Sequence, residues 1–233
     1  IAGSRMFELS GPLHLDFTQQ GKDLLNLVNV RIKLTPNTDS FALLTSGNYK
    51  IQIASAILYV RKVGIKPSIL MDHESKLKTD EASYPVQHTE MLTYTIPNGN
   101  QSHTRDNLFR GLMPKFILMA MTSNEAYNGK NSLNPFNFEP FGVNYIGLFR
   151  EGECITGKPL QPDFGAGKLA MRDYRFFYQN LEQYGINESC GITFEEFCKG
   201  YTMFAFNLTP DLEMAGHSQE EKEGDRKSTR LNS

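Results

Sequence analysis

The sequence predicts an all-β fold with a few short helices, specifically an antiparallel β-sandwich of the jelly-roll type. Three observations favour this class. Apolar and polar residues alternate with the period of a strand in several segments, turn-forming residues separate these segments, and few segments show helical spacing. The strand–helix alternation of a doubly wound parallel sheet is absent. With 233 residues, 39% of them hydrophobic, the chain can bury a substantial core.

The predicted strands are of two kinds. Apolar residues alternate with polar ones over residues 13–17, 28–34 and 92–96, which predicts strands with one face in water. The third of these strands is expected to stop at a turn formed by a Pro-Asn-Gly sequence. Other segments are continuously or nearly continuously apolar, which predicts strands covered on both faces. These are residues 51–63, 116–121, 143–149 and 201–206.

Three segments are predicted helices. A proline in the first turn favours a helix over residues 68–78. Aromatic and leucine residues at helical spacing predict a second helix over 174–184, with Gly185 as its stop. The sequence TFEE at 193–196 fits a capping box, so a short helix should begin there and end before Gly200.

Long connections between these elements are predicted at 98–107, 123–141 and 157–168. Long ordered loops inside a compact domain are usually functional. The second of them contains three phenylalanines, which indicates that it packs against something.

The composition excludes several classes of protein. A net charge of −2, from 24 Lys and Arg against 26 Asp and Glu, does not fit a protein that coats nucleic acid. No apolar stretch reaches the roughly 18–20 residues of a membrane span, and no secretion signal is visible. Cys154, Cys190 and Cys198 are too few and too widely spaced for a disulfide scaffold. We interpret them as thiols of a reducing compartment or of the core.

One segment resembles a nucleotide site but fails the motif. Residues 152–158 match the first seven positions of a phosphate-binding loop, whereas the eighth, where Ser or Thr would hold Mg²⁺, is Pro159. A proline also removes a backbone N–H donor from the phosphate cradle. We therefore predict a hairpin turn here.

We expect no catalytic residue, no cofactor and no metal site. The five histidines never form the H-x-H pattern of a metal-binding cupin, and His73-Glu74 has Leu77 where a zinc-protease helix has its second histidine. Cys154 is a lone cysteine, and such residues are usually small buried hydrophobes. The absence of a catalytic pattern favours a packing role.

An ordered set of short segments resembles the major capsid protein of Polinton (Maverick) transposons and adintoviruses. Any one of these strings alone is weak, but their order and spacing extend over residues from about 7 to 217. The segments are DLLNLVNVRIKL at 23–34, ILYVRKV at 57–63, NLFRGLMPK at 107–115, AYNG at 126–129, NPFNF at 134–138, KPLQPDF at 158–164 and GYTMFAFNLTPD at 200–211, with Gly216-His217 beyond them.

The resemblance implies a double jelly roll, in which two eight-stranded sandwiches in one chain form trimeric, pseudo-hexagonal capsomers. Residues 1–47 would then be the closing strands of the first jelly roll, and residues 48–217 the second jelly roll without its last strands. The implied partners are two further copies in a homotrimer, neighbouring capsomers and minor capsid or penton proteins. The implied location is the virion, assembled inside the host cell, and DNA contact is not indicated.

Two loops, 134–138 and 158–164, are the candidates for contacts between subunits, because they are aromatic and stiffened by proline. Arg150 is a candidate partner for an interface carboxylate. An alternative is left open, namely that these phenylalanines cap the subunit's own core. The candidate interface residues are Asn134, Pro135, Phe136, Phe138, Arg150, Pro159, Leu160 and Phe164.

Two other functions remain as alternatives. One is a cellular β-sandwich binding module, for example for carbohydrate, although the chain has no tryptophan for stacking on sugars. The other is a jelly-roll enzyme of the cupin type, which the missing H-x-H pattern disfavours.

The last residues have an unusual composition. Residues 218–224 are a polar run, and residues 225–233 resemble a one-frame translation of a common sequencing adapter. We predict that these nine residues are non-native; an ordinary basic tail is the alternative. We also expect the chain to be an internal fragment that aggregates when expressed alone, because missing strands leave sheet edges exposed.

Overall fold

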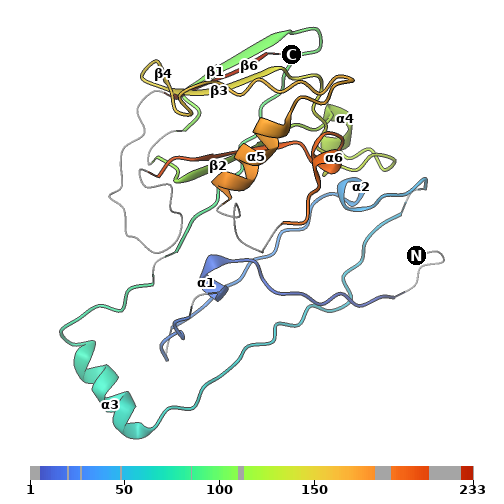
Figure 1. Cartoon of the computed structure of the whole chain (residues 1–233). Helices are drawn as coiled ribbons and strands as arrows, with labels where there is room; N and C mark the ends of the chain where they lie inside the picture. Colours follow the sequence, from blue (N-terminus) through green and yellow to red (C-terminus); the bar gives the residue numbers. More distant parts are fainter. Residues whose placement is uncertain are drawn as a thin grey trace. The chain divides into compact units, whose positions relative to one another are not determined.

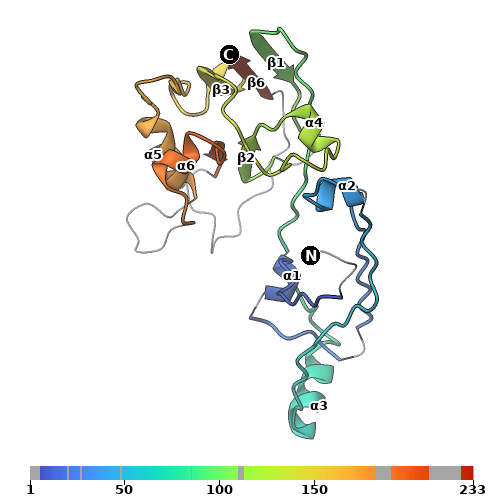
Figure 2. The same ribbon diagram turned by 90° about the vertical axis from the view of Figure 1, so that its right-hand side faces the viewer.

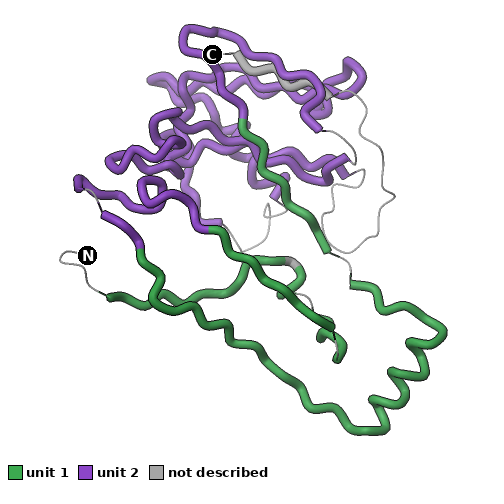
Figure 3. The backbone as a smooth tube through the Cα atoms, turned by 180° about the vertical axis from the view of Figure 1, so that it is seen from behind, with its two compact units in different colours: residues 1–35, 52–93 green, residues 36–51, 94–233 purple. Residues whose placement is uncertain are grey.

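The computed structural model describes residues 6–19, 21–26, 28–47, 49–84, 86–109, 113–181, 190–209 and 227–232 (Figure 1). The chain divides into two compact units that interleave along the sequence (Figure 3). Unit 1 comprises residues 1–35 and 52–93, and unit 2 comprises residues 36–51 and 94–233. Gly185, the predicted helix stop, and the polar run 218–224 lie outside the described residues.

Unit 1 consists mainly of extended chain. Its helices are α1 (Asp16–Gln19) and α3 (Pro67–Lys76), and its described residues contain no strand. The helix predicted over 68–78 is confirmed as α3, whose first turn contains the proline. Packing is sparse: the rings of Phe17 and Tyr84 meet edge to face, with their centroids 6.3 Å apart.

The strands predicted over 13–17, 28–34, 51–63 and 92–96 are not formed. The first of these segments runs into α1, and the others are extended without a partner strand. Alternation of apolar residues specifies a face, but a strand also needs a neighbour that takes its backbone hydrogen bonds. The turn predicted after residue 96 is confirmed, since the Asn100 N–H donates to the Pro97 carbonyl and Gly99 has a φ of +86°.

Unit 2 contains two antiparallel sheets (Figures 1 and 2). A four-stranded sheet has the order β1–β6–β3–β4, and a two-stranded sheet pairs β2 with β5. In the smaller sheet Ile117 is opposite Phe206 and Met119 is opposite Phe204. The strands are β1 (Ser102–Asp106), β2 (Phe116–Ala120), β3 (Tyr145–Arg150), β4 (Glu153–Cys154), β5 (Met203–Asn207) and β6 (Lys227–Asn232).

The turn between β3 and β4 is a tight two-residue hairpin. Glu151 and Gly152 have φ values of 53° and 87°, and Arg150 pairs with Glu153 across the turn. Positive φ at both central residues is the geometry of a type I′ turn, which matches the twist of the flanking strands. The prediction of a hairpin turn over a phosphate loop is therefore confirmed.

The core of unit 2 forms where α5 (Met171–Asn180) packs against β5, with α6 (Phe194–Phe197) beside it. Aromatic rings dominate this core, and Phe197 lies at its centre. Its ring is 5.5 Å from that of Tyr174 and 6.2 Å from that of Phe204. The apolar segment 201–206 is confirmed as a strand covered on both faces over its buried residues Phe204, Ala205 and Phe206.

Three other predictions for unit 2 need correction. The segment 116–121 is covered on one face only, because Leu118 is 50% exposed while Ile117 is buried. The predicted loop 98–107 contains β1, whose polar sequence shows no strand alternation. The predicted loop 123–141 contains α4 (Asn124–Tyr127), which Ser123 caps by accepting a hydrogen bond from the Ala126 N–H.

The remaining helix predictions hold in part. The capping box at Thr193 is confirmed and begins α6. The helix predicted over 174–184 is α5, which begins three residues earlier and ends at Asn180. The helix α2 (Asp39–Ala42) was not predicted. No helix within the described residues is both long and apolar enough to span a bilayer.

Taken together, the described residues form small antiparallel sheets and a few short helices, which confirms the β-rich, mostly non-helical class. The jelly-roll topology stays a prediction.

Candidate interaction surface

Two of the cysteines among the described residues make local hydrogen bonds. The described residues contain no cluster of three or more His, Cys, Asp or Glu that could hold a metal ion. The Cys154 sulfur lies 3.2 Å from the Thr156 hydroxyl, and the Cys190 thiol donates to the Tyr178 hydroxyl at 3.3 Å. Burial raises the pKa of the Cys198 thiol, which disfavours the nucleophilic thiolate.

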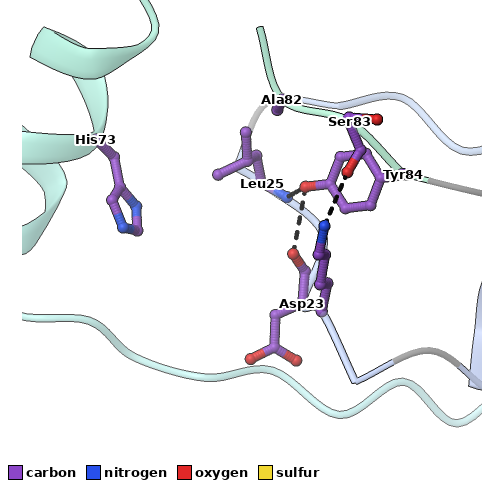
Figure 4. Close-up of a pocket in the computed structure, with 7 residues that line it drawn as sticks. Asp23, Leu25, His73, Ala82, Ser83 and Tyr84 are labelled. Atoms are coloured by element: carbon purple, nitrogen blue, oxygen red, sulfur yellow. Dashed lines mark hydrogen bonds between the residues drawn. The ribbon is translucent and has the colours of Figure 1, made fainter. Parts of the chain in front are cut away.

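An open hollow of about 430 Å³ lies within unit 1, and hydrogen bonds to the backbone engage part of its polar lining (Figure 4). The Tyr84 hydroxyl accepts from the Leu25 N–H at 3.1 Å and donates to the Asp23 carbonyl at 3.3 Å. The Lys22 ammonium donates to the Ser83 carbonyl at 3.3 Å. His73 reaches toward the hollow from α3, while the Asp23 carboxylate points away from the Tyr84 ring (Figure 4). The hydrogen bonds given for this lining thus hold the backbone of residues 23–25 and 83–84 together.

The loop 134–138 is held rigidly in unit 2. The Asn134 side chain accepts from the Phe136 N–H at 3.0 Å, which closes an Asx turn. The Phe138 N–H donates to the Gly200 carbonyl at 2.8 Å, and the Phe138 carbonyl accepts from the Thr202 N–H at 2.9 Å. These two bonds make a parallel bridge between the loop and the chain that enters β5. Backbone pairing therefore fixes the loop independently of what its side chains touch.

Glycine at position 200 leaves room for the Asn137 side chain beside the bridge. A Cβ built there would collide with the Asn137 side-chain oxygen. That side chain is itself anchored, because its amide donates to the Glu139 carboxylate at 2.7 Å. A larger residue at position 200 would therefore push the Asn137 side chain away from its bond to Glu139.

Phe136 is the exposed aromatic residue of this loop. Its side chain is 60% exposed, and its ring meets that of Phe41 edge to face with the centroids 5.7 Å apart. Tyr201, opposite Phe138 in the bridge, is 49% exposed. We call the exposed rings of Phe136 and Tyr201, together with the half-buried Phe41 that packs on Phe136, the aromatic surface. It presents apolar rings on a rigid backbone, an arrangement suited to burial against a partner.

A segment that is distant in the sequence, residues 40–47, contacts the chain just before the loop 134–138. The Thr45 N–H donates to the Asn131 carbonyl at 2.8 Å, and the Asn131 side chain donates to the Gly47 carbonyl at 3.4 Å. Gly129 has a φ of +88° and passes so close to Ser40 that a side chain there would strain both segments. These contacts place α2, and with it Phe41, beside the loop.

The other predicted interface residues divide between core and surface. Leu160 is buried and exchanges two backbone hydrogen bonds with Ile146, so it belongs to the core. Phe164 is half-buried, with its ring 6.2 Å from that of Phe197. Pro159 and Phe138 are half-buried as well, and Pro135 is buried. For these residues the packing favours the alternative that they cap the subunit's own core.

Asn134 and Arg150 are exposed. The first holds the Asx turn, and the second ends β3 beside the hairpin turn, away from the loop in sequence. Phe41 and Tyr201 were missed by sequence reasoning. Tyr201 was counted with a strand covered on both faces, and nothing in the sequence links Phe41 to a loop so far along the chain.

Comparisons with known proteins give one distant relative. The chain is 27% identical over 215 residues to a protein of Caenorhabditis elegans described as "Uncharacterized protein F54H12.2". The match covers 89% of this chain and 51% of the relative, so the chain spans about half the length of that protein. No family model matches the chain, and no solved structure matches it.

Proposed function

We propose that the chain is a large part of a major capsid subunit, which acts by assembling with copies of itself into trimers and then into an icosahedral shell. A protein of this kind does no bond chemistry; its work is the burial of surface against other subunits. In this role its partners are two further copies, neighbouring capsomers and minor capsid or penton proteins, and its place is the virion.

The observation that carries the proposal is the amount of apolar surface that unit 1 leaves exposed. Large aliphatic side chains stay accessible along both extended segments, 28–34 and 52–65; Val30, for example, is 52% exposed. Monomeric proteins rarely expose contiguous apolar patches larger than a few hundred Å². A chain with this pattern is stable only when other polypeptide covers it, as happens in an obligate assembly.

Two further observations support the same role. The ordered resemblance to Polinton and adintovirus capsid proteins extends along nearly the whole chain. The aromatic surface of unit 2 adds exposed rings on a fixed backbone, and aromatic residues are enriched at the centres of interfaces.

Electron microscopy of the full-length gene product tests the proposal. The expected result is trimeric capsomers, or shells built from them, at micromolar protein. Monodisperse monomers at the highest soluble concentration would overturn it.

The same preparation separates the alternatives. A cellular β-sandwich module would stay monomeric and bind a carbohydrate or other ligand in a titration. A cupin-type enzyme would copurify with a metal ion, detectable by elemental analysis, and lose it to chelators.

A further inference from the structure

The chain contains two Asn-Gly pairs, Asn98-Gly99 and Asn128-Gly129, and both lie among the described residues. In such a pair the backbone nitrogen of the glycine can attack the side-chain amide carbon of the asparagine, because glycine has no Cβ to hinder the approach. A folded protein permits this attack only where the local backbone is free to rotate. The two pairs therefore offer the same chemistry in two different surroundings.

The first pair forms the centre of an open turn. Asn98 and Gly99 are both exposed, and the Asn100 N–H closes the turn on the Pro97 carbonyl at 3.3 Å. A turn of this kind does not use the N–H of its third residue, and within the described residues no hydrogen bond holds the Gly99 N–H. A Cβ built at Gly99 would meet no atom within 4 Å. The attacking nitrogen is thus free of both hydrogen bonds and packing in the part of the chain that the structure describes.

The second pair is held by hydrogen bonds at both reacting groups. It follows α4 directly, and Asn128 is the C-cap of that helix (Figure 1). The side-chain amide of Asn128, which would have to leave, donates to the Asn124 side-chain oxygen at 3.1 Å. The Gly129 N–H, which would have to attack, donates to the Ala126 carbonyl at 3.1 Å. Reaction at this pair therefore requires that the end of the helix open first.

Packing restrains the second pair as well. A Cβ built at Gly129 would collide with the Ser40 hydroxyl and would lie 3.2 Å from the Phe41 backbone nitrogen. The backbone of Gly129 thus lies directly against residues 40–41. Rotation of the peptide group between Asn128 and Gly129 would push these two segments apart, whereas the corresponding rotation at Gly99 displaces no neighbour.

We propose that Asn98 is a site of spontaneous deamidation in the folded protein, and that Asn128 is protected from the same reaction. The Gly99 nitrogen gives its proton to a base in the solvent and forms a bond to Cγ of Asn98. The bond from Cγ to Nδ2 breaks, and this nitrogen takes up a proton and leaves as ammonia. Water then opens the cyclic imide at Cγ to give aspartate, or at the backbone carbonyl carbon to give isoaspartate. The net reaction consumes water, releases ammonia and oxidises nothing.

The modification changes a connection between two residues that touch. The turn lies between Tyr94 and β1, and the Arg105 guanidinium of β1 lies 4.9 Å from the centre of the Tyr94 ring. Both products place a carboxylate where the chain had a neutral amide. Isoaspartate also adds a methylene group to the main chain, so it lengthens the connection between these two contacting side chains.

Peptide mass spectrometry of the aged full-length protein tests the proposal. The folded protein is incubated at mildly alkaline pH, and peptides containing each pair are followed over time, with isoaspartate labelled by an isoaspartyl methyltransferase. Asn98 should convert faster than Asn128 by about tenfold or more, because only Asn128 must wait for local opening. In concentrated urea the two rates should become similar, because both pairs then react from unfolded chain.

The matched control is Asn98→Gln, whose longer side chain forms the cyclic imide far more slowly. It should abolish conversion in this peptide and leave the melting temperature unchanged. Equal rates at Asn98 and Asn128 in the folded protein would overturn the proposal, as would an Asn98 that reacts only in urea or a peptide of Asn98→Gln that still converts. The comparison of folded and unfolded wild type needs no variant. The test is independent of the capsid role, since it reads the same in a monomer and in an assembled shell.

Discussion

At the scale of single residues, Asp173 is a carboxylic acid in a place that suits a neutral group. It is 2% exposed in the first turn of α5, and its Oδ1 atom has no hydrogen-bond partner among the described residues. Burial raises the pKa of this carboxyl to about 6, and the nearby charge of Arg172 offsets that effect only in part.

We predict that Asp173 makes the folded protein less stable as pH rises. Its pKa in the unfolded chain is about 3.9, so the folded state binds the proton more tightly. The free energy of unfolding that this group contributes is greatest below about pH 4 and is lost as pH rises through about 6. In Asp173→Asn this loss disappears, and at pH 7.5 the variant should be more stable by on the order of 1–2 kcal/mol.

Urea denaturation of the full-length protein and of Asp173→Asn at several pH values measures this difference. The exposed Glu153→Gln is the control and should show no such gap. A difference between wild type and Asp173→Asn that stays constant from pH 4 to 7.5 would contradict the assignment.

Two phenylalanines of the candidate interface have opposite predicted roles. Phe136 is exposed and touches Phe41, whereas Phe164 packs on Phe197 in the core. In the full-length protein, Phe136→Ala should therefore weaken self-association and leave the melting temperature of the dilute monomer unchanged. Phe164→Ala should lower the free energy of unfolding by about 2 kcal/mol, because it removes ring contacts from the core.

Light scattering across a concentration series gives the association, and thermal melts at high dilution give the stability. Phe136→Ala that melts as early as Phe164→Ala would show that the aromatic surface is part of the fold and not a contact for a partner.

At the scale of elements, the capping box shows how a short local signal positions the core. The Thr193 N–H donates to the Glu196 carboxylate at 2.8 Å, and the Thr193 hydroxyl accepts from the Glu196 N–H at 3.3 Å. These bonds hold the one-turn helix α6, which carries the fully buried Phe197. The Thr193 N–H and the Thr193 hydroxyl, which also donates to the Glu196 carboxylate at 2.8 Å, lower the pKa of Glu196, because its charged form is the better acceptor.

We predict that Thr193→Ala destabilises the protein by about 1 kcal/mol, the usual cost of losing an N-terminal cap. Thr193→Ser keeps the hydroxyl and should stay within a few tenths of wild type. The denaturation midpoints of the two variants test this prediction. If alanine and serine lower the free energy of unfolding equally, the effect comes from the lost methyl group and not from the lost cap.

The elements that the sequence predicts correctly are those with local signals. The capping box, the proline of α3 and the Glu151-Gly152 turn each encode their own geometry within a few residues. Strand pairing depends instead on distant chain. The alternation over 28–34 therefore predicts a strand although no neighbour among the described residues pairs with it, and the polar sequence of β1 predicts none although β6 pairs with it.

For the candidate surface, too, the sequence predicts local features and misses contacts between distant segments. The sequence identified the loop 134–138 from its proline and aromatics, and its exposed Phe136 is the centre of the aromatic surface. The burial of Leu160 could not be predicted, because it follows from a bridge to Ile146 on another part of the chain. The neighbour Phe41 likewise becomes visible only when the chain is folded.

At the scale of the whole molecule, the two units differ in how fully they bury their apolar side chains. Unit 2 encloses an aromatic core with Phe197, Phe206 and Leu148 fully buried. Unit 1 has extended segments whose aliphatic side chains remain accessible. Paired strands need both hydrogen-bond partners and a covered face, and the described residues of unit 1 have neither. Under the proposed capsid role, unit 1 depends on other polypeptide to cover these side chains.

This dependence gives a prediction for the 233-residue chain alone compared with the full-length protein. Expressed alone, the chain should aggregate, because exposed apolar segments without partners associate with each other. In hydrogen–deuterium exchange of its soluble fraction, residues 28–34 and 52–65 should exchange within seconds, while residues 203–207 stay protected as an internal control. In the assembled full-length protein both segments of unit 1 should become protected by at least a hundredfold. A monomeric, cooperatively melting 233-residue protein with slow exchange over 28–34 would show instead that unit 1 folds without any partner.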